Sequence, residues 1–79
     1  MTDSIPPRDP AFQKLVTVLG PVRADAVVQE TLARLQLTRL ATADDRFRFG
    51  CELIARGGVL EAIGRSIKIQ AILHGAREQ

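Results

Sequence analysis

Two side chains in this sequence, Cys51 and His74, carry the soft ligand atoms that zinc prefers. A structural zinc site takes about four such ligands, so one cysteine and one histidine per chain are too few. The same two residues could form a nucleophilic cysteine–histidine pair, but no motif orients them. We therefore expect Cys51 to pack as a small apolar side chain and His74 to lie at a helix C-terminus.

The adjacent acids Asp44 and Asp45 could perform general acid–base chemistry. Their position just after Thr42 gives a structural reason for them, because the helix dipole stabilises negative charges in the first turn of a helix. The glycines form neither the dinucleotide-binding nor the phosphate-loop pattern. The sequence thus predicts no enzymatic activity, no cofactor, no metal and no small-molecule substrate.

The composition describes a small soluble domain with an aliphatic core. The chain has 79 residues, is 46% hydrophobic, and contains three Phe, no Trp and no Tyr. Its formal charge of +2 is too small to imply nucleic acid by itself. The single cysteine fits a reducing compartment, and no apolar run resembles a secretory signal or a membrane span. We expect a cytoplasmic protein with a flexible N-terminal arm at 1–8 and a single helical domain at 9–79.

Capping residues and apolar periodicity predict two helices in the first half of the chain. Asp9 suits an N-cap and Pro10 the first helical position, which starts a helix over about 10–19. Gly20 can end that helix, and Pro21 can open the next, over about 21–36. In that second helix one stripe is apolar or weakly polar: Ala24, Val27, Val28, Thr31, Leu32 and Leu35.

The second half of the chain predicts a helical hairpin. Thr42 is a good N-cap for a helix over about 43–56, and Gly57-Gly58 lets the chain reverse. A last helix over about 58–74 follows. The fold class is therefore all-α, a small bundle of four helices in which the last two form the hairpin.

The last helix is apolar around most of its circumference. On a helical projection, one apolar face holds Leu60, Ile63, Gly64, Ile67, Ala71 and His74. A neighbouring face holds Val59, Ala62, Ser66, Ile69 and Leu73. Only Glu61, Arg65 and Lys68 form a clearly polar stripe. Helices this apolar are normally buried on several sides, which favours a central helix or a helix at an interface.

Gly64 in the middle of that helix needs a reason, because glycine there costs about 1 kcal/mol relative to alanine. Gly57, Gly64 and Ala71 recur at intervals of seven residues. Small residues let another backbone come close. Two interpretations remain open: a seam for self-association or partner docking, and close packing inside the chain.

The leading functional hypothesis is a small non-enzymatic protein–protein interaction module, an adaptor or regulatory subunit. It would form a homodimer or other homo-oligomer, or dock a protein partner, through its last helix. In this hypothesis isoleucines and leucines supply apolar area, Gly64 and Ala71 permit close approach, and Arg65 and Lys68 attract acidic groups. The predicted partner-binding residues are Phe49, Leu53, Ile63, Gly64, Arg65, Ile67, Lys68, Ile69, Ala71 and Leu73.

The alternative hypothesis is a small DNA-binding or transcription-regulating protein. Its basic residues would be Arg46, Arg48, Arg56, Arg65, Lys68 and Arg77. The ordinary interpretation of such charges, a solvated helix face, is preferred, because the sequence offers few groups for base edges and no aromatic platform.

Overall fold

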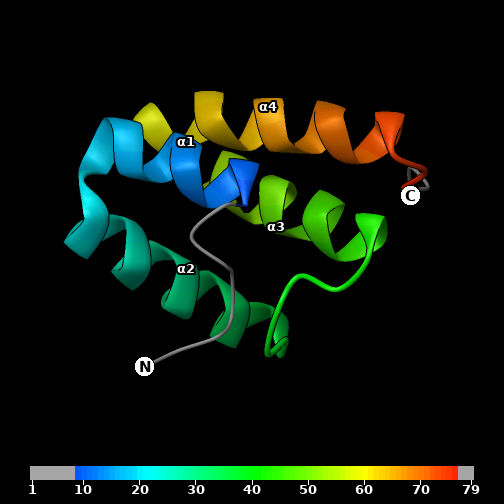
Figure 1. Cartoon of the computed structure of the whole chain (residues 1–79), viewed down its shortest axis with the longest axis horizontal. Coiled ribbons are helices and arrows are strands. Elements are labelled where there is room, and N and C mark those ends of the chain that lie inside the picture. The colour runs from blue at the N-terminus through cyan, green and yellow to red at the C-terminus, as the bar shows by residue number, and fades with distance from the viewer. Residues whose placement is uncertain (1–8, 77–79) are drawn as a thin grey trace. The chain divides into compact units, whose positions relative to one another are not determined.

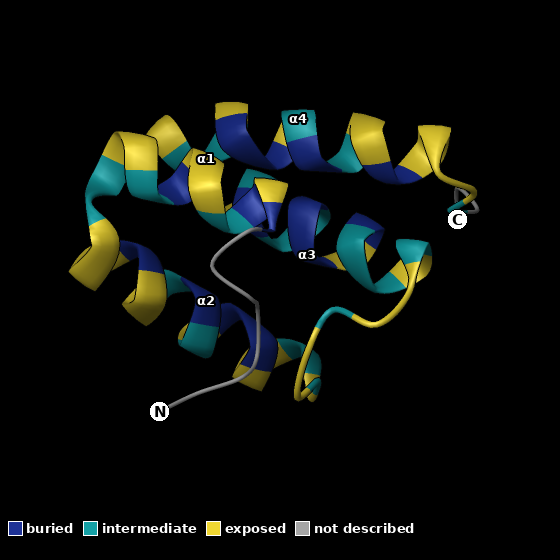
Figure 2. Cartoon of the chain, in the orientation of Figure 1, coloured by how far each residue is buried: buried dark blue, intermediate teal, exposed yellow. Residues whose placement is uncertain are grey.

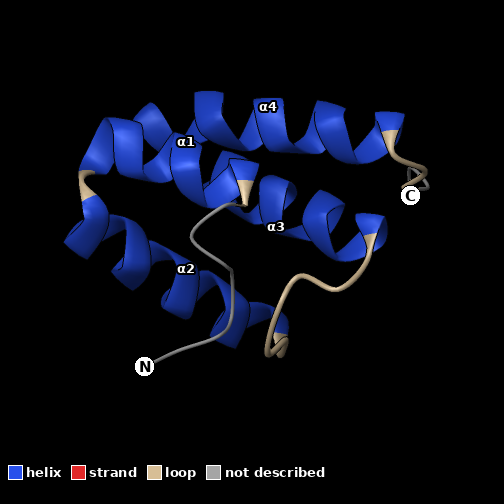
Figure 3. Ribbon diagram, viewed as in Figure 1, coloured by secondary structure: helices blue, strands red, loops and turns tan. Residues whose placement is uncertain are grey.

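The computed structural model describes residues 9–76. Its elements are α1 (Pro10–Leu19), α2 (Pro21–Leu35), α3 (Ala43–Arg56) and α4 (Gly58–Leu73), shown in Figure 1. The described residues contain no strand, as Figure 3 makes clear. The prediction of an all-α fold with four helices is confirmed, and the predicted arm at 1–8 lies outside the described residues.

The helices group into two compact units, with the boundary between Arg39 and Leu40. The first unit contains the helical pair α1 and α2, and the second contains the pair α3 and α4. Tight packing of α3 on α4 confirms the predicted helical hairpin. The expectation of a single domain over 9–79 stays a prediction.

In the first unit, local capping sets the helix ends. The Asp9 side chain accepts a hydrogen bond of 2.9 Å from the Ala11 backbone N–H, and Pro10 occupies the first turn, as predicted. Gly20 has φ +84°, which glycine adopts without strain, and it separates α1 from α2. The buried residues of these two helices are Ala11, Leu15, Ala24, Val28, Thr31 and Leu32.

The end of α2 lies one residue before the predicted position, at Leu35. Gln36 adopts the left-handed conformation, with φ 59° and ψ 39°. Its backbone N–H donates to the Ala33 carbonyl, and the Leu37 N–H donates to the Leu32 carbonyl. This pair of bonds is a Schellman motif, which usually places glycine at the left-handed position. A non-glycine residue carries the strain here.

A complete capping box starts α3. The Asp45 backbone N–H donates to the Thr42 hydroxyl at 3.0 Å, and the Thr42 backbone N–H donates to the Asp45 carboxylate at 3.2 Å. The Ala41 N–H donates to the same carboxylate at 3.0 Å. Asp45 therefore completes the box, although glutamate or glutamine is the usual residue at that position. The acid pair Asp44-Asp45 thus has a structural role in the first turn of α3.

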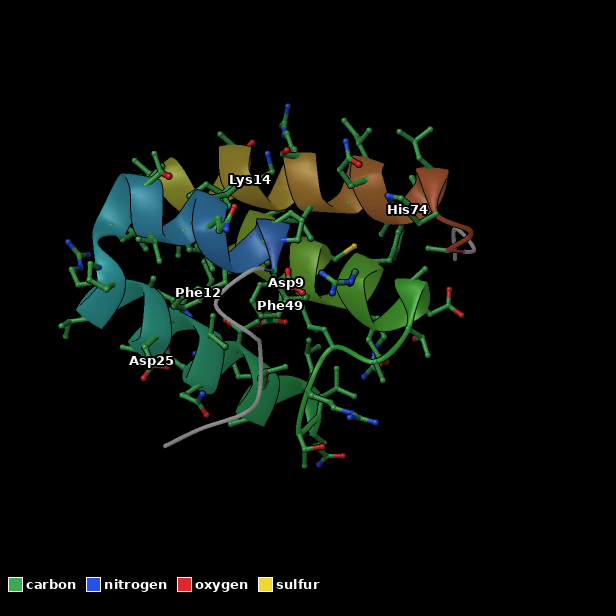
Figure 4. All side chains as sticks on the ribbon, viewed as in Figure 1. Asp9, Phe12, Lys14, Asp25, Phe49 and His74 are labelled. Atoms are coloured by element: carbon green, nitrogen blue, oxygen red, sulfur yellow. The ribbon has the colours of Figure 1, made fainter. Side chains whose placement is uncertain are left out.

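Glycines bound α4 at both ends. Gly57 and Gly58 have φ values of +75° and +60°, and they reverse the chain between α3 and α4. Gly75, with φ +104°, ends the helix. There the Gly75 N–H donates to the Ile72 carbonyl and the Ala76 N–H to the Ala71 carbonyl, in a second Schellman motif. The helix ends at Leu73 rather than 74, and His74 is its C-cap (Figure 4).

Candidate interaction surface on the last helix

The two helices of the hairpin meet backbone to backbone at Gly50 and Gly64. A Cβ atom added at Gly64 would lie 2.6 Å from the Gly50 carbonyl oxygen and 2.9 Å from the Ile54 nitrogen. A Cβ atom added at Gly50 would lie 2.7 Å from the Gly64 carbonyl oxygen. Real Cβ atoms essentially never come this close, so each position requires glycine for this helix spacing. Gly64 thus serves close packing inside the chain, one of the two interpretations that the sequence left open.

The predicted partner-binding residues divide into a buried set and a surface set. The buried set consists of Phe49, Leu53, Ile63, Gly64, Ile67 and Ala71. These residues lie in the interior of the protein, so their side chains expose almost no surface that a partner could contact. The surface set consists of Arg65, Ile69 and Leu73, which are exposed, and Lys68, which is half-buried. The structure therefore brings only these last four residues to positions that a partner could touch.

The side of α4 that faces away from its buried residues is apolar and open to solvent. Ile69 is 56% exposed, Leu73 72% and Val59 57%. Figure 2 shows α4 with buried residues along one side and exposed residues along the other. Monomeric proteins carry scattered exposed apolar side chains, but a contiguous group of them typically marks an interaction site.

We call Val59, Ala62, Ser66, Ile69 and Leu73 the outer stripe. Their spacing of three, four, three and four residues is a heptad pattern, and it keeps them on one side of the helix. Ser66 is half-buried and the other four are exposed. Helical periodicity predicted this face, and in the structure it differs from the buried face that holds Ile63, Gly64, Ile67 and Ala71.

Charged groups border the outer stripe along one edge. Arg65 donates to the Glu61 carboxylate at 2.6 Å, one turn earlier, and its side chain remains 66% exposed. The Lys68 ammonium lies 5.3 Å from the centre of the Phe47 ring, within the range of a cation–π contact. Two cations and one acid leave this edge weakly positive. The opposite edge, at Gln70, is neutral.

The residues considered for chemistry show no metal-binding arrangement in the part of the chain that the structure describes. Cys51 is a free, half-buried thiol, and His74 is exposed at the end of α4. Over residues 9–76, no group of three or more His, Cys, Asp or Glu side chains is placed to hold a metal ion. In the same part of the chain, every buried side-chain nitrogen or oxygen has a hydrogen-bond partner.

No helix among these residues is long and apolar enough to cross a lipid bilayer.

By class, then, this is an all-α protein with a glycine-packed helical hairpin and an exposed apolar stripe on its last helix. The chain matches no family model, and no curated protein or solved structure shows significant similarity to it.

Three residues were missing from the predicted site. Gly50 was not recognised as the partner of Gly64, although each glycine stands seven residues from Gly57 and a hairpin brings such positions together. Val59 and Ile72 belong to the exposed apolar surface, with Ile72 38% exposed. The heptad spacing of the outer stripe was the signal for Val59. Ile72 lies among Glu61, Arg65 and Lys68 on a helical projection, so the projection does not group it with either apolar face.

Proposed function

We propose that this chain is a small non-enzymatic interaction module that self-associates or docks a protein partner through the outer surface of α4. The observation that carries the proposal is the exposure of Ile69 and Leu73, one helical turn apart, on a face that α3 leaves uncovered. Burying such side chains stabilises an association by about 1.5–3 kcal/mol each before the costs of binding.

The second support is the small size of each helical unit. Short helical pairs have few apolar contacts of their own, and small domains without disulfides or metals often gain stability by association. The basic edge of Arg65 and Lys68 would form the polar rim that borders the apolar centre of an interface. The protein would act as an adaptor or regulatory subunit, in the cytoplasm as its single free cysteine suggests.

The test is the double substitution Ile69→Asp with Leu73→Asp. Both side chains are mainly exposed, so the fold and its melting temperature should change little, whereas two buried carboxylates would abolish an interface. For the natural chain, sedimentation equilibrium should give a mass that rises with concentration, or affinity capture should isolate a discrete partner protein. The double variant should show neither result.

The matched control is Val22→Asp, which also places an acid at an exposed valine, 81% exposed, but in α2. This control should retain every association of the natural chain. A natural chain that is monomeric throughout and captures nothing, or a double variant that associates as well as the natural chain, contradicts the proposal.

A further inference from the structure

We draw no further inference here: the strongest candidate, the exposed apolar surface patch that the outer stripe forms on α4, carries nothing beyond the proposed function because nothing in the structure shows what covers it.

Discussion

At the scale of single residues, the most telling position is Gln36, because it holds the left-handed conformation that a Schellman motif usually gives to glycine. Left-handed backbone costs a residue with a Cβ atom roughly 1–2 kcal/mol. The Gln36 side chain is exposed, and only its backbone forms the capping hydrogen bonds. The position therefore combines backbone strain with little contribution from the side chain.

We expect Gln36→Gly to stabilise the protein by up to about 1 kcal/mol, since glycine relieves the strain but has more freedom to lose on folding. Urea unfolding followed by circular dichroism would measure the change. Ala26→Gly, at an exposed position inside the same helix, should have the opposite sign and destabilise by about 1 kcal/mol. A loss of stability in both variants would mean that the glutamine side chain contributes to the cap.

Capping residues were the part of the structure most accessible from the sequence. Asp9-Pro10, Thr42 and Gly57-Gly58 set the starts of α1, α3 and α4 where they were predicted, because each acts through its own backbone or the next turn. The end of α2 was placed one residue late, since a left-handed glutamine has no sequence signature. The sequence predicted Thr42 only as an N-cap, because the capping box has aspartate in place of the usual longer acid.

At the scale of elements, the α3–α4 hairpin depends on the absence of side chains at Gly50 and Gly64. We expect Gly64→Ala to lower the free energy of unfolding by about 2 kcal/mol, although alanine is the better helix former. The added methyl would meet the Gly50 carbonyl oxygen and the Ile54 nitrogen, which are backbone atoms and cannot move aside cheaply. Thermal or urea unfolding measures the loss.

Ser66→Ala is the control for this prediction, because it lies on the same helix, away from the α3 contact, and should change stability by less than about 0.5 kcal/mol. If Gly64→Ala proved as stable as the natural chain, α3 and α4 would have to separate slightly at no cost. That result would remove the reason given for glycine at both positions.

The face that α4 turns toward α3 was the least predictable feature of the candidate site. Helical projection groups residues correctly, but it does not say which of two apolar faces a neighbour covers. That choice depends on Gly50, in a different helix, and on the reversal at Gly57-Gly58. As a consequence, the predicted site combined residues of the covered face, such as Ile67, with exposed residues such as Leu73.

At the scale of the whole molecule, the small net charge argues against the DNA-binding alternative. Eleven basic and nine acidic residues give a formal charge of +2. We expect only weak binding to duplex DNA that disappears between about 50 mM and 200 mM salt, because few phosphates could be neutralised. Fluorescence anisotropy with two unrelated duplexes would measure it.

The control for this measurement is Arg48→Gln with Arg56→Gln, which removes two exposed cations from α3 and should abolish any weak binding. Tight binding to one duplex and not to the other, with a steep salt dependence, would favour the DNA-binding alternative over the interaction module.

Each helical pair is formed by consecutive helices, α1 with α2 and α3 with α4, and this local connectivity bears on how the chain reaches its structure. Contacts between sequence neighbours need little loop closure, so such proteins fold quickly. The residues of the first pair all precede α4 in the chain, so they leave the ribosome before α4 does. Because α4 follows α3 directly in the chain, this apolar helix finds α3 already present when it leaves the ribosome and spends little time exposed.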